Sequence, residues 1–267
     1  MIRFFKETGK YTGVLLALLL HFSLQAQPER PPRVIHVMVA LCDNASQGIA
    51  PVPPLIGDGD DPFNNLYWGC GYGVKTFFRK SPNWQLVREQ KRPHADEVVL
   101  ERLVFRHRKK NAYLVADAYR GREIKTALND FLDALNGVKG EDISVSGVSL
   151  RIGGYADMLA YVGHNGLMEF SLPEVRRKNI YKKREGVVLA CSSTDYFENH
   201  FKLSEAHPLL QTTDLMAPEA YTLEAVIEEW LKPEHTRESI HRAAARTYQK
   251  YQKCSLRGAE NLFQSGW

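Results

Sequence analysis

Residues 158–166 read MLAYVGHNG, and residues 186–193 read GVVLACSS. Each stretch begins with a short apolar run and ends at a reactive side chain, His164 in the first and Cys191 in the second. Short apolar runs without alternation are typical of strands that are buried on both faces of a parallel sheet. The interval between them leaves room for a loop and a return to the sheet. We therefore expect two parallel neighbouring strands whose carboxyl ends meet at one edge.

The chain on either side continues this alternation of strands and helices. Residues 34–41 (VIHVMVAL) predict a first buried strand, and residues 97–107 and 111–119 predict two adjacent strands. Residues 123–135 have the apolar spacing of a helix with one buried face. Further helices are expected over residues 66–79, 173–181, 221–231 and 237–253. The pattern predicts an α/β fold with a mainly parallel sheet and helices on both faces.

The first residues have the pattern of an export signal. A positively charged start is followed by an apolar run over residues 14–20 and by the small residue Ala26, just before a cleavage expected at Gln27. The run is shorter than the roughly 20 residues that a membrane-spanning helix needs. We expect residues 1–26 to be a signal peptide, with an uncleaved anchor as the alternative, and residues 27–267 to form a single exported domain, periplasmic or secreted.

Composition and charge limit the classes of partner. The chain is 44% hydrophobic and 25% charged, with a formal net charge of +4, which is ordinary for a globular protein. Its basic residues are interleaved with acidic ones, and the densest basic run, residues 176–184, is interpreted as a solvated surface. A nucleic-acid partner is therefore not expected.

His164 and Cys191 are candidates for a catalytic pair. A thiolate is a strong nucleophile, and a nearby imidazole can take the thiol proton and later pass it to a leaving group. Main-chain N–H groups at Gly166 and Cys191 are expected to hold the oxyanion of a tetrahedral intermediate. A helix beginning near residues 192–195 would direct the positive end of its dipole at the sulfur. The alternative is a buried packing cysteine and a hydrogen-bonding histidine.

The segment that contains this pair resembles a known family. YVGHNG, the following LPEV and then VVLACSSTDYF are similar to the catalytic core of the caspase-like peptidases, which include gingipains, legumains and caspases. The resemblance covers residues 157–197. It implies a caspase-like three-layer sandwich, with His164 as acid and base, Cys191 as nucleophile, and a peptide or protein as substrate. No metal or organic cofactor is needed for that chemistry.

The resemblance has two departures and also bears on the substrate pocket. Asn165 stands between His164 and the next glycine, and the interval from His164 to Cys191 is short for the family. In the family, loops after the other strands shape the pocket for the substrate. Asp43, Asn44 and Asp117 are expected at the same sheet edge, where an acidic pocket would favour a basic side chain. Turn capping is the alternative role for such residues.

Three other interpretations remain open. Cys70 follows an aromatic, glycine-rich stretch where a helix is expected to begin, as in papain-like enzymes, and it could use His164 as its partner. The acidic loop Asp58–Asp61 offers oxygen ligands that calcium prefers, although it lacks EF-hand spacing. A catalytically inactive caspase-like protein that binds peptides is the third. Pairing among Cys42, Cys70 and Cys254 cannot be assigned from sequence.

Overall fold

The computed structural model describes residues 30–174, 176–179 and 182–267, so the signal peptide expected over residues 1–26 lies outside the described residues. Residues Pro32–Trp267 form one compact unit. Among the described residues, no helix has both the length and the apolar character required to cross a bilayer.

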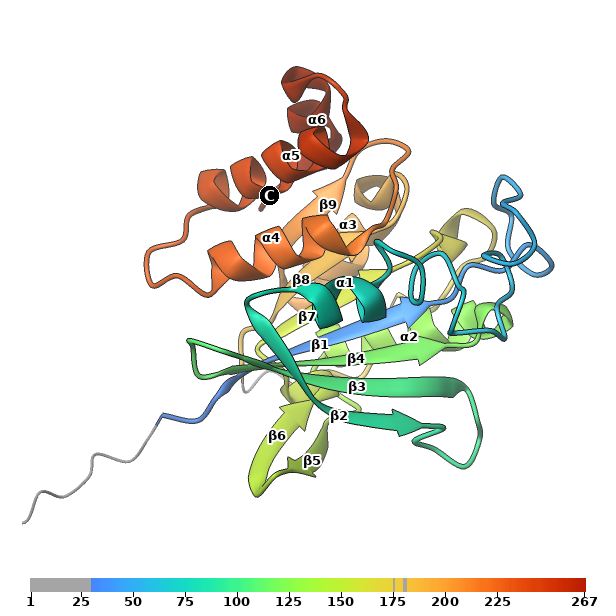
Figure 1. The fold of residues 1–267 in the computed structure, drawn as a ribbon. Coiled ribbons are helices and arrows are strands. Elements are labelled where there is room, and N and C mark those ends of the chain that lie inside the picture. Colours follow the sequence, from blue (N-terminus) through green and yellow to red (C-terminus); the bar gives the residue numbers. More distant parts are fainter. Residues whose placement is uncertain (1–29, 175, 180–181) are drawn as a thin grey trace, which may run out of the picture. The chain divides into compact units, whose positions relative to one another are not determined.

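An eight-stranded sheet forms the middle of this unit, in the order β10-β9-β8-β7-β1-β4-β3-β2 (Figure 1). Its strands are β1 (Arg33–Ala40), β2 (Trp84–Lys91), β3 (Val99–His107), β4 (Ala112–Tyr119), β7 (Met158–Val162), β8 (Glu185–Leu189), β9 (His207–Thr212) and β10 (Phe263–Gln264). Strands β4, β1, β7, β8 and β9 run parallel, whereas β2, β3 and β10 pair antiparallel. The predicted mainly parallel sheet is confirmed.

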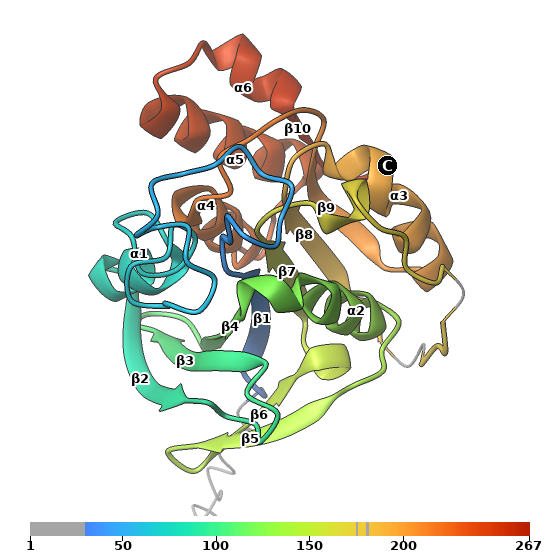
Figure 2. The same cartoon turned by 90° about the vertical axis from the view of Figure 1, so that its right-hand side faces the viewer.

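Helices cover both faces of the sheet because the side chains of its strands alternate between two apolar cores. Ile35, Val37 and Val39 of β1 pack in one core, while Met38 and Ala40 pack in the other. The first core is covered by α1 (Val74–Lys80), α4 (Ala220–Trp230), α5 (Arg237–Gln252) and α6 (Leu256–Leu262). The second is covered by α2 (Ile124–Leu135) and α3 (Ser193–Ser204). The result is three layers, helices, sheet and helices (Figures 1 and 2).

A two-stranded hairpin extends the second helical layer. It consists of β5 (Glu141–Val145) and β6 (Val148–Ile152), and its apolar side chains pack against Val34 and Val104 of the sheet. The sequence did not predict this hairpin, nor β2 or β9.

The helix predicted over residues 173–181 is wrong for the described part of that segment, which has no regular structure. The described residues of this segment are mainly charged or polar, so they cannot form an apolar helix face that packs on the sheet. Leu172 is the buried residue just before them. Arg176 forms an ion pair with Asp133 on α2 at 2.6 Å instead. The first predicted helix is shorter than expected, because turns occupy residues 66–73 before α1 begins.

Asp117 does not follow β4, as predicted, but lies within it. Its carboxylate is 1% exposed and accepts hydrogen bonds from Arg102 at 2.7 and 2.8 Å and from His36 at 3.0 Å. The His36 Nδ1 atom accepts the Gly153 N–H at 3.1 Å, so Nε2 carries the proton that it donates to Asp117. A carboxylate enclosed in this way cannot line a substrate pocket at the strand end, so that predicted role is wrong.

Arg102 is what lets the strand continue through an acidic residue. It stands opposite Asp117 on the neighbouring antiparallel strand β3. Burial alone would raise the pKa of the Asp117 carboxyl, but attraction to Arg102 and the hydrogen bonds from Arg102 and His36 outweigh it and hold this pKa well below its usual range.

Replacing Asp117 with asparagine should therefore destabilise the protein. At pH 7 the Asp117→Asn variant leaves the buried Arg102 with only the half-exposed Glu141, at 3.3 Å, as counter-charge, and we expect the free energy of unfolding to fall by about 3 kcal/mol. Because the pKa of Asp117 is lowered in the folded state, its contribution is present above the unfolded pKa and is lost as the pH falls. The difference between wild type and variant should narrow below about pH 4.

Urea denaturation at several pH values measures this difference. The matched control is Asp142→Asn, which removes an exposed pair with Arg151 at 3.8 Å and should cost less than about 0.5 kcal/mol. Equal stability of the two variants at pH 7 would contradict the structural role assigned to Asp117.

Candidate functional site

His164 and Cys191 leave the sheet at the same level and at the same edge. Strands β7 and β8 are parallel neighbours, and Val162 at the end of one is in register with Leu189 at the end of the other. His164 and Cys191 each lie two residues beyond that pair. Figure 2 shows the strand ends with the long loop that follows β1 in front of them. The predicted adjacency of the two strands is confirmed.

This edge also contains the point where the strand order reverses. From β1 the chain continues to the β4 side of the sheet, whereas from β7 it continues to β8 and β9 on the other side. In open parallel sheets, loops diverge at such a point and leave a crevice outside the carboxyl ends of the strands. His164, directly after β7, lies at that point.

Gly163 permits the turn that delivers His164. Its φ of +148° is disfavoured for other residues, and a Cβ atom there would lie 2.9 Å from the Ala40 carbonyl oxygen of the neighbouring strand. The His164 side chain is 9% exposed, and the Tyr161 hydroxyl donates to the His164 carbonyl at 2.7 Å. The backbone at His164 is thus fixed from inside the sheet.

Glu169 holds the His164 ring from the opposite side. One carboxylate oxygen, Oε1, is hydrogen bonded to His164 Nε2 and also accepts the Gly48 N–H at 2.6 Å. A side chain at Gly48 would collide with this carboxylate, because a Cβ atom would lie 2.4 Å from Oε1. Glu169 therefore joins the histidine to the loop after β1. A carboxylate that orients an imidazole is the third member of many catalytic sites.

Glu169 was not identified from the sequence. Its only signal is its position just beyond the short 3-10 turn Gly166–Met168 that follows His164. A turn that tight brings the carboxylate back to the ring, but the contact with Gly48 depends on the fold.

Cys191 lies on a sharp turn between β8 and α3. The next residue, Ser192, has a left-handed backbone with φ of +48°, a conformation that costs a non-glycine residue of order 1–3 kcal/mol. The Ser193 hydroxyl, which accepts the Thr212 N–H at 2.8 Å, ties this turn to β9. The 12-residue helix α3 begins two residues after Cys191, within the range of starts predicted from the sequence.

The loop after β9 contacts the Cys191 sulfur. The Met216 N–H donates to Sγ at 3.4 Å, and the thiol is 3.7 Å from the Met216 carbonyl oxygen. The Asp214 carbonyl accepts the Ser192 N–H at 3.0 Å. The thiol therefore lies between its own turn and the Asp214–Met216 segment.

Asn165 connects the two turns. It is completely buried, and its amide nitrogen donates to the Cys191 carbonyl oxygen at 2.8 Å. Its side-chain oxygen accepts the Leu167 N–H at 3.2 Å and so caps the 3-10 turn. The departure from the caspase-like pattern at this position thus has a structural role.

Two predicted features of the pair are not found. Among the described residues, no hydrogen bond joins the His164 ring to the Cys191 thiol. Gly166 cannot serve as an oxyanion donor, because it is buried and its N–H donates to the His164 carbonyl at 3.1 Å. The glycine is consumed by the turn that Asn165 caps. Of the two predicted donors, the Cys191 N–H remains.

Cys42 and Cys70 lack the features of a nucleophile. All four cysteines are free thiols. Burial raises the pKa of Cys42 to about 11. Burial also raises the pKa of Cys70, whose thiol donates to the Asn64 carbonyl at 3.1 Å and which precedes the first residue of α1 by four positions. Cys70 is therefore not at the helix N-terminus that the papain-like interpretation requires.

Asp43 and Asn44 build the loop after β1. Asp43 accepts the Ala45 N–H at 2.9 Å and the Ser46 hydroxyl at 2.6 Å, and Asn44 is hydrogen bonded twice to the backbone of Val52. These are the contacts of turn capping, which was the alternative to a substrate-binding role.

The acidic loop does not form a calcium site in the described structure. Asp60 is paired with Arg120 and, at 2.6 Å, with Arg122. Nowhere in the described ranges do three or more histidine, cysteine or acidic side chains gather closely enough to hold a metal ion. The positive charges that neutralise Asp60 are thus those of Arg120 and Arg122, where the calcium interpretation expected a metal ion.

Asn165→Ala should loosen the connection between the two turns. It leaves the buried Cys191 carbonyl without its donor, and we expect the free energy of unfolding to fall by about 1–3 kcal/mol. The control is Asn199→Ala, an exposed residue on α3. Chemical denaturation compares the two, and an equally small loss in both would exclude a structural role for the Asn165 bond.

The sequence matches no family model, and no curated protein or solved structure is significantly similar to it. The geometry of the site is therefore what supports a function.

Proposed function

We propose that the protein is an exported cysteine hydrolase of the caspase-like type, which cleaves peptide bonds through Cys191 and His164. The observation that carries the proposal is the register of β7 and β8, which brings a cysteine and a histidine out at one level of a parallel sheet. The Asn165 bond to the Cys191 carbonyl supports it by holding the two turns together. Export is proposed from the pattern of residues 1–26.

The reaction divides into acylation and hydrolysis. In acylation, the Cys191 sulfur attacks the peptide carbonyl carbon, its proton passes to His164, and the carbonyl π electrons move to oxygen. The C–N bond then breaks, and His164 returns the proton to the departing amine, leaving a thioester. In hydrolysis, water attacks the thioester and gives a proton to His164. The C–S bond breaks, and the proton returns to sulfur.

Groups next to His164 and Cys191 have proposed roles in these steps. Glu169 occupies Nε2 of His164, which leaves Nδ1 as the nitrogen that exchanges protons. The carboxylate also stabilises the imidazolium that forms when His164 is protonated. In this proposal the Cys191 N–H and the positive end of α3, which begins two residues later, stabilise the negative charge that develops on the carbonyl oxygen. No step requires a metal or an organic cofactor.

A peptide-binding protein without catalytic activity is the second candidate. It is favoured by the absence of a hydrogen bond between the described His164 ring and Cys191 thiol. Catalytic hydrogen bonds often form only when substrate is bound, so both functions are compatible with the absence of this bond. Covalent labelling of the thiol distinguishes them.

Peptide acyloxymethyl ketones test the assignment of the nucleophile. They should alkylate Cys191 alone, and mass spectrometry should locate the adduct on that residue. We expect His164→Ala to slow labelling by about 100-fold or more, because the thiol loses its proton acceptor. Cys70→Ser is the matched control and should label at the wild-type rate. An adduct on Cys70, or no adduct under native conditions, would overturn the proposal.

Glu169→Gln tests the orienting carboxylate. Its amide oxygen can still accept both hydrogen bonds, so the thermal midpoint should stay near that of wild type while the charge is lost. We expect kcat/KM on a peptide substrate to fall at least about 10-fold, mainly in kcat. Glu174→Gln, an exposed acid in the same connection, is the control and should have no effect. A Glu169→Gln variant with wild-type kcat would remove Glu169 from the mechanism.

A further inference from the structure

The exposed large apolar side chains lie mainly in segments at the carboxyl ends of the strands. The described part of the chain exposes eight such side chains, and six of them lie on segments that follow the carboxyl ends of the parallel strands. The six are Leu55, Phe63, Tyr72, Met168, Tyr196 and Leu215. Single exposed apolar residues are normal, so each of the six is informative only through its surroundings.

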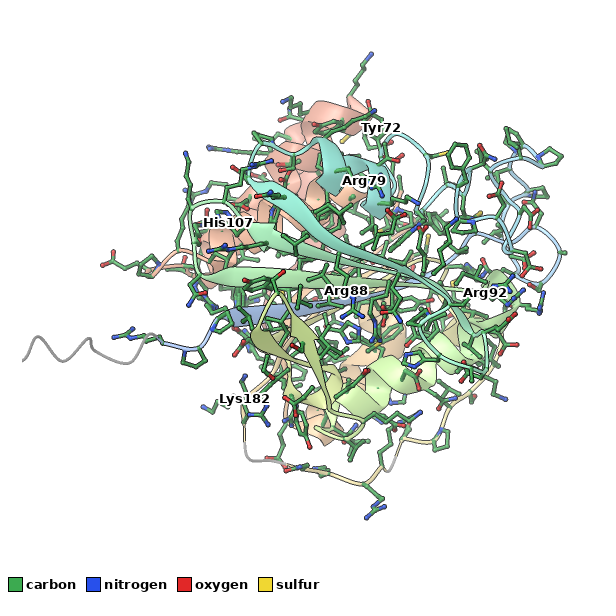
Figure 3. The ribbon with its side chains drawn as sticks, turned by 60° about the horizontal axis from the view of Figure 1, so that its bottom comes forward. Tyr72, Arg79, Arg88, Arg92, His107 and Lys182 are labelled. Carbon is green, nitrogen blue, oxygen red and sulfur yellow. The ribbon has the colours of Figure 1, made fainter. Side chains whose placement is uncertain are left out.

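The surface along β2 carries charged side chains. Arg79, Arg88 and Arg92 are labelled on this side of the sheet in Figure 3. Tyr72, in the turn before α1, is labelled in the same view near Arg79, and Phe63 lines a hollow together with Arg79 and Arg92. The six exposed apolar residues therefore do not form one patch, and Leu215 is the one that directly precedes the residue hydrogen bonded to the Cys191 sulfur.

A hollow adjoins the loop that contacts the Cys191 sulfur. It has a volume of about 520 Å³, and its apolar lining consists of Leu215, Tyr248 and Leu262. The other lining residues are Thr213, Asp214, Cys254, Gly258 and Asn261. Leu215 is 71% exposed and directly precedes Met216, whose backbone contacts the thiol. The Tyr248 hydroxyl accepts the Ala217 N–H at 3.0 Å and so fixes the same loop from behind. One short segment thus borders both the hollow and the reactive sulfur.

Three acidic side chains at this edge are engaged, whereas Asp195 in the first turn of α3 is exposed. Asp43 is bonded to its own turn, Asp60 to arginines and Glu169 to His164. Asp214 is the acidic residue of the hollow, and one of its oxygens already accepts the Leu215 N–H at 2.7 Å. Its carboxylate is exposed to water, which weakens its attraction for a cation. A basic side chain would therefore gain less here than an apolar one.

We propose that the substrate is a peptide with a large apolar side chain beside the cleaved bond, and that this side chain occupies the hollow next to Leu215. This inference rests on the proposed cysteine hydrolase function. It replaces the basic preference expected from Asp43, Asn44 and Asp117. A leucine or phenylalanine side chain removed from water by Leu215, Tyr248 and Leu262 gains binding through the hydrophobic effect.

Labelling with a matched ketone series tests the preference. The peptides differ only in the residue beside the ketone, which is leucine, phenylalanine, lysine, arginine, aspartate or asparagine. The leucine and phenylalanine reagents should label Cys191 about 10-fold faster than the charged ones. In Leu215→Ser this advantage should fall by about threefold or more, while Leu256→Ser, a matched change on α6, should keep it.

The outcomes separate the two proposals. Labelling of Cys191 that is fastest with lysine, arginine, aspartate or asparagine overturns the apolar preference and leaves the hydrolase intact. An apolar preference that Leu215→Ser does not reduce overturns the placement in the hollow. Failure of every reagent to label Cys191, while iodoacetamide still reacts with it, overturns the proposed function itself.

Discussion

The hydrogen bond from the Asn165 amide to the Cys191 carbonyl connects the two halves of the site. The register of β7 and β8 places both turns at one level, but the backbone pairing ends at Val162 and Leu189. Beyond the strand ends, each turn would be free to move without a further contact. The buried Asn165 supplies that contact at 2.8 Å and also caps the turn that follows His164. An unsatisfied amide there would be costly, so the arrangement has few alternatives.

The surrounding structure holds conformations that the chain would not adopt alone. Ser192 has a left-handed backbone, and Gly163 has a φ that only glycine adopts readily. Both lie directly beside the candidate catalytic residues. Two hydrogen bonds keep these turns in place. The Thr212 N–H donates to the Ser193 hydroxyl, and the Tyr161 hydroxyl donates to the His164 carbonyl. Strain of this kind is often found where side chains must be presented at one fixed angle.

Much of the fold could be predicted because buried parallel strands have a strong sequence signal. The apolar runs that became β1, β7 and β8 are continuous, and α2 has clear helical spacing. The short β9 and the hairpin β5–β6 lack such a signal. Asp117 was predicted at the edge of the sheet, but it lies inside β4. Its partner Arg102 lies on another strand, and single-sequence reasoning does not reveal that pairing.

The candidate site was predictable to a similar extent. His164 and Cys191 follow apolar runs and could be found from sequence. Gly166 was misassigned because its N–H is used inside a turn whose shape depends on Asn165. Glu169 was missed because its contact with Gly48 joins residues that are far apart in the chain. Local patterns thus indicated the candidate catalytic side chains but not the groups that contact them.

The rate of Cys191 alkylation by iodoacetamide at neutral pH, measured with and without His164, tests the central claim most directly. Cys254 is an exposed thiol that lines the hollow beside Leu215, so it is replaced by serine, and N-acetylcysteine in the same solution provides the reference. We expect Cys191 to react faster than this reference and to lose that advantage in His164→Gln. Equal rates for Cys191 in wild type and variant would contradict a shared proton between these two residues.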